Sequence, residues 1–99
     1  MKQRYQSFNE FYPFYLSQHQ HPICRHLHFI GSALILVVLA YTLYSQQFMW
    51  LISLPIIGYG FAWIGHFIFE KNRPATFTYP LWSLMGDWKM FWQILTRQL

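Results

Sequence analysis

Charged residues are scarce in this chain of 99 residues, and they are missing from its middle. Asp, Glu, Lys and Arg make up 10% of the sequence, against roughly 25% in ordinary globular proteins. None of the four occurs between Arg25 and Glu70. A soluble domain of this size buries too little surface to hide an apolar fraction of 55%. The sequence therefore predicts a single membrane domain over residues 1–99.

Cysteine and acidic residues are also few. Cys24 is the only cysteine, which excludes an intramolecular disulfide and a Cys/His zinc motif. Basic residues outnumber acidic ones by seven to three, but they flank the apolar segments instead of forming a stripe. We therefore expect no nucleic-acid partner. The first residues lack an apolar run with a cleavage site, so we expect no removable signal peptide.

Two apolar segments, at about residues 26–44 and 48–70, are each long enough to cross a membrane. At 1.5 Å per residue the first spans roughly 28 Å, close to the thickness of the hydrocarbon layer. Pro55 predicts a kink in the second segment. The polar turn at residues 45–47 is so short that the two helices it joins must be antiparallel neighbours. We expect an all-α, multi-pass integral membrane protein built on a transmembrane helical hairpin.

A further helix is expected on each side of the hairpin. Residues 6–18 carry a dense aromatic face, and residues 81–99 repeat apolar side chains at amphipathic spacing. Both segments therefore predict amphipathic helices at the membrane interface. All Lys and Arg residues lie outside the hairpin turn, so the positive-inside rule places both termini in the cytoplasm.

Two of the five histidines lie just inside the ends of the charge-free stretch. An ionisable ring is costly in a membrane span, which indicates a function. His28 lies 18 residues before Gln46, and His66 lies 20 residues after it. At 1.5 Å per residue, the two depths agree to within about 3 Å. We therefore expect the two rings to face each other near the cytoplasmic boundary.

Small residues place both rings on the faces where the helices meet. Gly58 and Ala62 precede His66 at steps of four, and Gly31 follows His28 by three. Small residues mark the closest approach of membrane helices. Each histidine is therefore expected at the contact between the two spans.

Two other residues, Glu70 and His19, are candidates for the same site. Glu70 follows His66 by four, so it is expected either to bind a metal or to accept the second ring N–H of that histidine. Pro22 turns the chain, which can bring His19 over the mouth of the hairpin. His26 and His28 point to different faces, and His28 is the one expected inside.

The residues alone leave three interpretations open. The histidines form a metal site, or His28 and His66 are the axial ligands of a haem. In the third interpretation the chain is a non-enzymatic membrane protein, such as a small pore former or assembly factor, in which the rings only pack.

Two longer motifs carry a family resemblance. The pattern His-x4-(Asn or Cys)-x3-His is filled by His19, Cys24 and His28. The pattern Gly-His-x3-Glu-Lys-x-Arg-Pro is filled by Gly65, His66, Glu70, Lys71, Arg73 and Pro74. With both motifs the chain resembles the small membrane family (Mpo-like) that includes the yeast endoplasmic-reticulum 2-hydroxy fatty acid dioxygenase. Its compact length resembles the bacterial members, and its Cys24 stands where the fungal pattern has Asn.

The resemblance implies an iron(II)-dependent enzyme that uses O2 to shorten 2-hydroxy fatty acids by one carbon, a step of fatty acid α-oxidation. Carried over by position, the implied iron ligands are His19, His28 and His66, while His21 and His26 match no diagnostic position. The bacterial inner membrane is the expected location, or the endoplasmic-reticulum membrane in a eukaryote. Because two spans make a thin bundle, we also consider a homodimer that completes the site.

Four charged residues receive supporting roles in this interpretation. Glu70 is expected to hold His66 in its ligating orientation, as a partner outside the ligand set. Arg73 or Arg25 is expected to pair with the substrate carboxylate, because a guanidinium can bind it through two hydrogen bonds. Lys71 is a further candidate for that carboxylate.

Overall fold

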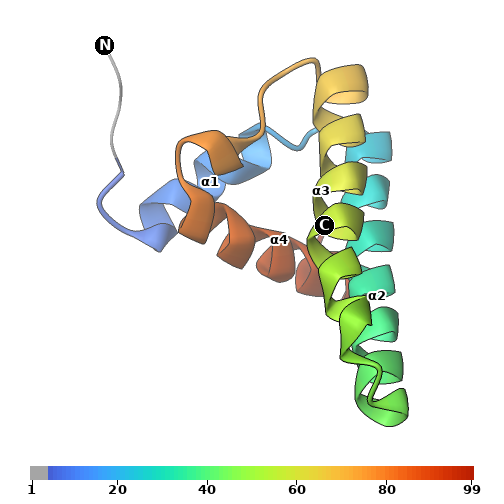
Figure 1. Cartoon of the computed structure of the whole chain (residues 1–99). Helices are drawn as coiled ribbons and strands as arrows, with labels where there is room; N and C mark the ends of the chain where they lie inside the picture. Colours follow the sequence, from blue (N-terminus) through green and yellow to red (C-terminus); the bar gives the residue numbers. More distant parts are fainter. Residues whose placement is uncertain (1–4) are drawn as a thin grey trace.

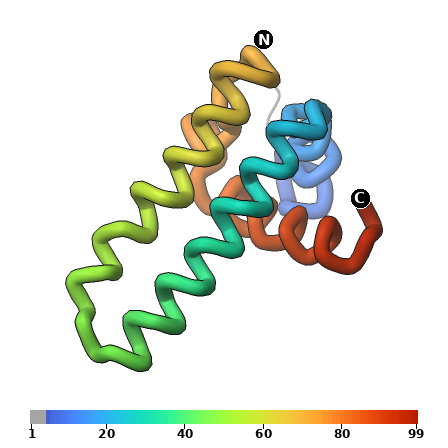
Figure 2. The backbone as a smooth tube through the Cα atoms, turned by 90° about the vertical axis from the view of Figure 1, so that its right-hand side faces the viewer, coloured from blue at the N-terminus to red at the C-terminus, as the bar shows by residue number. Residues whose placement is uncertain are grey.

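The computed structural model describes residues 5–99, and all seven elements in that range are helical. In chain order they are α1 (Phe8–Ser17), α2 (Pro22–Ser45), η1 (Phe48–Ile52), α3 (Ser53–Ile64), η2 (Gly65–Glu70), η3 (Ala75–Phe77) and α4 (Pro80–Leu95). Helix α2 and the segment η1–α3–η2 form a long antiparallel hairpin, and α1 and α4 project together to one side of it (Figures 1 and 2). The predicted all-α fold, two long apolar helices flanked by two others, is confirmed.

Both arms of the hairpin are long and apolar enough to cross a membrane by length and composition, at Pro22–Ser45 and Phe48–Glu70. Gln46 ends α2 in the left-handed conformation, with φ 58°. Pro55 falls in the first turn of α3, where its missing N–H costs no helical hydrogen bond. Just before it, at Ile52 and Ser53, the arm changes from the 3-10 helix η1 to the α-helix α3, and the kink at Pro55 stays a prediction.

Small residues bring the two arms together, as their spacing predicted. A Cβ atom on Gly65 would lie 2.8 Å from the Sγ of Cys24. A Cβ atom on Gly31 would lie 3.0 Å from the Cβ of Phe61. Neither position can carry a side chain without a shift of its neighbour, so these glycines set how closely the arms approach.

The hairpin differs from the helices of a soluble protein in where its polar and apolar side chains lie. The buried polar side chains are His19, His28, Ser32, Thr42, His66 and Ser83. Large apolar side chains are exposed along the whole hairpin, and α3 contains no buried residue. An exposed apolar surface of this extent costs free energy in water, so it favours surroundings that are themselves apolar.

Helices α1 and α4 pack on each other through an aromatic core. Phe11, Tyr12 and Tyr15 of α1 are buried in one cluster with Met90 of α4. A Cβ atom on Gly86 of α4 would lie 2.9 Å from the ring of Tyr15. The aromatic face of α1, which the sequence predicted for the membrane interface, is therefore covered by α4. The apolar stripe of α4 stays exposed at Leu81, Leu84 and Met85.

The end of the second arm changes helix type. Segment η2 is a π-helix that continues α3, and π-turns are frequent at functional sites. Lys71 then adopts the left-handed conformation, with φ 57°. The backbone N–H groups of Lys71 and Asn72 both donate to the carbonyl of His66. This turn folds the chain back over the last helical turn and brings Asn72 beside His66.

Candidate metal centre

Three histidines from three segments meet at the end of the hairpin opposite its turn. His19 follows α1, His28 belongs to α2 and His66 lies in η2. Their ring centroids are 4.6, 4.4 and 5.1 Å apart, and the ring planes are inclined at 79° to 90° to one another. One ligand atom from each histidine lies within 4.8 Å of the other two, and all three side chains are buried. The three ligands that the sequence predicted are therefore brought together.

The second nitrogen of each ring is already occupied. His19 Nδ1 is 2.6 Å from the carbonyl oxygen of Tyr15, and His28 Nδ1 is 2.9 Å from that of Cys24. His66 Nδ1 is 2.7 Å from Oδ1 of Asn72. These oxygens only accept, so each Nδ1 carries a proton, and in the neutral form of each ring the lone pair is then at Nε2. This is the tautomer that a metal-binding histidine needs.

The group fits a divalent transition metal. Nε2 of His19 is buried and pairs with no other atom of the described residues. A buried nitrogen lone pair without a partner is costly, and metal coordination removes that cost. Three imidazoles suit Fe(II), Zn(II) and similar ions, and leave coordination positions open for other ligands. The His19, His28 and His66 group could therefore hold a metal.

His19 is held in place from both sides. Its ring stacks on Tyr15 with centroids 4.0 Å apart, and Nε of Arg25 donates to its backbone carbonyl. Burial, reinforced by the neighbouring rings of His28 and His66, lowers the pKa of His19 well below 6.5. His19 is therefore neutral at pH 7, as a metal ligand must be.

Asn72 takes the role that the sequence assigned to Glu70. Its Oδ1 accepts from His66, and its Nδ2 donates to the carbonyl and to Oε1 of Gln18, both at 3.1 Å. Oε2 of Glu70 instead accepts the backbone N–H of His21, at 2.6 Å. The predicted Glu70–His66 contact is thus replaced, because the left-handed turn at Lys71 folds Asn72 back onto the ring. Asn72 occupies the unassigned x position of the second motif, and its amide was the available signal.

The two remaining histidines lie outside the cluster. His21 caps the start of α2, where its Nδ1 accepts the N–H of Ile23, and its ring lies 5.3 Å from that of Phe69. His26 is exposed, so the prediction that His28 is the inward residue of this pair is confirmed.

A cavity of about 310 Å³ opens beside the three rings, and its walls come mainly from α2, α3 and α4, with further residues from α1 and from the segment around η3. Most of its lining is apolar. Two polar side chains of α4 also line it, Ser83 and Asp87. Ser83 Oγ is buried and pairs with no described atom, and Asp87 accepts a hydrogen bond from the hydroxyl of Tyr15. Burial raises the pKa of Asp87 to about 7, although the Tyr15 hydrogen bond acts in the opposite direction.

The three cationic residues proposed for the substrate carboxylate do not line this cavity. Arg25 is engaged with the His19 carbonyl, Lys71 is exposed, and the guanidinium of Arg73 lies 5.2 Å from the ring of Phe77. Their role at the substrate carboxylate stays a prediction. The sequence motif could not show that the left-handed turn carries Lys71 and Arg73 outward.

The comparison with protein families accords with this geometry. The family model described as 2-hydroxy-palmitic acid dioxygenase Mpo1-like matches residues 5–99, nearly the whole chain. The chain belongs to the Mpo1-like family. No curated protein and no solved structure matches it. Both motifs that carry the Mpo1-like resemblance lie at the histidine cluster, on the two arms of the hairpin and the turns that follow α1 and η2.

Proposed function

We propose that this chain is an iron(II)-dependent membrane dioxygenase that shortens 2-hydroxy fatty acids by one carbon. The observation that carries the proposal is the buried triad of histidines, in which one ligand atom of each ring lies within 4.8 Å of the other two, beside a mostly apolar cavity. The description of the Mpo1-like family supplies the substrate class. Iron(II) with three imidazole ligands has open positions at which a 2-hydroxy acid and O2 can bind together, and so supplies the oxidative chemistry.

The proposed reaction balances without a further reductant. A 2-hydroxy acid and one O2 give the acid one carbon shorter, CO2 and water. The bond between the carboxyl carbon and the 2-carbon breaks, and the 2-carbon is oxidised to the new carboxyl carbon. O2 takes up the electrons and is reduced.

Residues of the chain have separate tasks in this proposal. Tyr15, Cys24 and Asn72 fix the tautomers of the three histidines through the Nδ1 hydrogen bonds. Ser83 can donate its unpaired hydroxyl to the carboxylate or 2-hydroxyl of the substrate. The apolar lining excludes water and receives the acyl chain.

The rival functions account for less of the structure. A haem binds two axial protein ligands, which leaves His19 buried in the cluster without a role. A non-enzymatic membrane protein gives no reason for three aligned Nδ1 hydrogen bonds around one point. Zinc also suits three histidines, so the metal itself must be identified by elemental analysis.

Membrane insertion is part of the proposal. The inside-out polarity supports an integral protein, with the hairpin crossing the bilayer and both termini in the cytoplasm. For a bacterial member this is the inner membrane. An impermeant reagent added outside intact cells should not label tags at the two ends of the chain. It should label both tags after the membrane has been permeabilised. Labelling of either tag from the outside would refute the orientation.

The decisive experiment combines metal content and product analysis. Protein loaded anaerobically with iron(II) is given a 2-hydroxy fatty acid with and without O2, and its absorption spectrum is recorded. We expect the shorter acid only with O2, and no Soret band. His28→Ala and His66→Ala should lose both iron and product, whereas the exposed His26→Ala should keep both. Iron content unchanged in the first two variants would refute the site.

A further inference from the structure

The cavity beside the histidines is elongated and changes character along its length. His66, Ala62, Gly58 and Leu54 all line it and follow one another at steps of four. This spacing puts them on one face of the helical arm, over a length of roughly 18 Å. His66 is at one end of that stripe, and Leu54 is at the other, toward the hairpin turn.

The walls that face this stripe, on α2 and α4, also change from polar to apolar along the cavity. Along α2 the lining residues run from His28 through Ser32 to Ile35. Leu84 and Trp88 of α4 add apolar wall beside Ser83 and Asp87. The histidines and Ser32 thus lie toward one end of the cavity, and the lining around Gly58 and Leu54 is apolar apart from Tyr59. A space of this form fits a linear amphiphile with its polar head at the histidines.

Toward the turn, the wall of the cavity includes a close contact between the two arms. A Cβ atom on Gly58 would lie 3.1 Å from Cδ1 of Ile35, and both residues line the cavity. A methyl group at position 58 would therefore press the end of Ile35 and narrow the space. Gly60, on the same helix, has no atom within 4 Å of such a Cβ.

We infer that Ile35, Leu54 and Gly58 form the end of an acyl channel and set the chain length that the site accepts. The inference rests on the proposed function for the identity of the polar head, and it adds where the tail lies and what limits it. Because the wall is apolar and fixed by helix packing, each added or removed methylene changes the fit. In apolar pockets one methylene changes selectivity by about tenfold or more.

Three variants test the channel in the metal-loaded full chain. Gly58→Ala narrows the channel, Leu54→Ala lengthens it, and Gly60→Ala is the matched control on the open side of α3. Each is assayed with a series of unbranched 2-hydroxy fatty acids of increasing length. Binding of the corresponding fatty acids without the 2-hydroxyl is measured in parallel by calorimetry, because this readout needs no turnover.

We expect Gly58→Ala to shift the preference for chain length, in kcat/KM and in Kd, to shorter acids by about tenfold. Leu54→Ala should shift it to longer acids, and Gly60→Ala should leave the wild-type profile unchanged. An unchanged profile in Leu54→Ala, with the protein folded and binding, would overturn the inference. If the wild type binds acids but makes no product, the proposed function fails, and the binding profiles alone decide the inference.

Discussion

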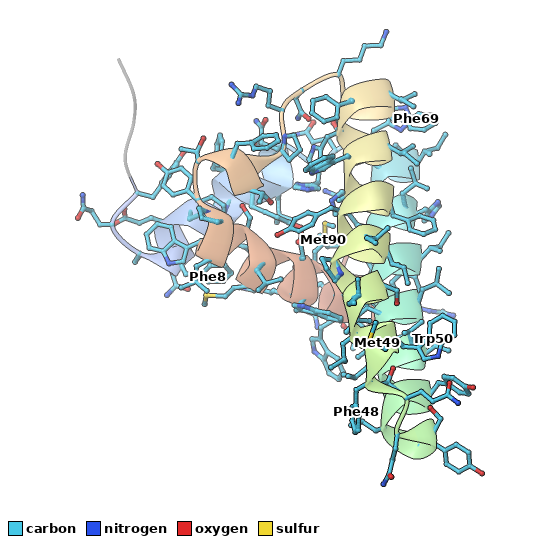
Figure 3. The ribbon with its side chains drawn as sticks, in the orientation of Figure 1. Phe8, Phe48, Met49, Trp50, Phe69 and Met90 are labelled. Atoms are coloured by element: carbon cyan, nitrogen blue, oxygen red, sulfur yellow. The ribbon has the colours of Figure 1, made fainter. Side chains whose placement is uncertain are left out.

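The two ends of the α2–α3 hairpin are built in different ways. At the histidine end, hydrogen bonds join segments far apart in the sequence, such as His21 to Glu70 and Asn72 to Gln18. At the turn, the side-chain bonds are local, as between Trp50 and Gln47. Four of the five buried residues of α2 lie between Cys24 and Ser32. Figure 3 shows Phe48, Met49 and Trp50 at the turn and Phe69 near the opposite end.

This difference separates two requirements on one pair of helices. The turn end needs only apolar side chains and enough helical length, because contacts with its surroundings stabilise it. The histidine end must hold three nitrogen atoms in fixed places, and that demands polar partners from other segments. Substitutions should therefore have graded effects, large at the histidine end and small at the turn.

The largest loss of stability is expected at Gly65, where the two arms approach closely. In Gly65→Leu the new side chain meets both the Sγ and the backbone Cα of Cys24, so the arms must separate. Overpacking of this kind costs about 3 kcal/mol, and we expect loss of bound iron as well. Gly60→Leu, which points to open space, is the control. Equal unfolding midpoints for the two variants in detergent would show that the close approach of the two arms at Gly65 does not contribute to stability.

Removal of the Asn72 amide should have the second-largest effect, which is on metal binding. Asn72→Ala leaves Nδ1 of His66 without its acceptor and Gln18 without its donor. Removing such a partner of a ligating histidine weakens metal binding by roughly 10- to 100-fold. Glu70→Gln removes the charge that the sequence placed in this role and should weaken binding less. Iron titration of the two variants compares them directly, and a larger loss in Glu70→Gln would reverse the assignment.

The third prediction concerns pH. Asp87 releases its proton near pH 4 in the unfolded chain and near pH 7 in the folded one. Between these values the folded state binds more protons, so the free energy of unfolding falls as pH rises. Because Asp87 is partly exposed, we expect a decrease of about 1–2 kcal/mol.

Asp87→Asn should remove this part of the pH dependence. Unfolding of metal-free protein at pH 4.5 and 7.5 measures it, and the difference between variant and wild type cancels the titration of the histidines. Parallel pH profiles for the two proteins would contradict the prediction.

The smallest effect is expected at the turn. Met49 is 76% exposed, so Met49→Ala should change the free energy of unfolding by less than about 0.5 kcal/mol and leave iron content unchanged. The same substitution at the buried Met90 should cost about 2 kcal/mol or more, which shows that the assay is sensitive. A loss of iron in Met49→Ala would mean that the two ends are coupled.

The same contrast explains what could be predicted from the sequence. The spans, their antiparallel pairing and the equal depth of His28 and His66 follow from counting along regular helices. The inward choice of His28 over His26 follows from helical phase. These properties depend on one or two segments, so periodicity and spacing are enough.

The remaining features depend on contacts between distant segments. The aromatic face of α1 finds its partner in α4, which no local pattern reveals. Asn72 displaces Glu70 because the chain reverses at Lys71, a non-glycine residue in the left-handed conformation. The same reversal directs Arg73 away from the cavity. A linear motif records which residues occur together and gives no information about these directions.

The packing of α4 also bears on how the protein is made. Tyr15, which stacks on His19, is covered by Gly86 and hydrogen-bonded to Asp87, and the ribosome synthesises both of these residues after the hairpin. Tyr15 therefore gains its full set of contacts only when the last helix has docked. We expect the histidine cluster to be completed late, after the hairpin has been synthesised.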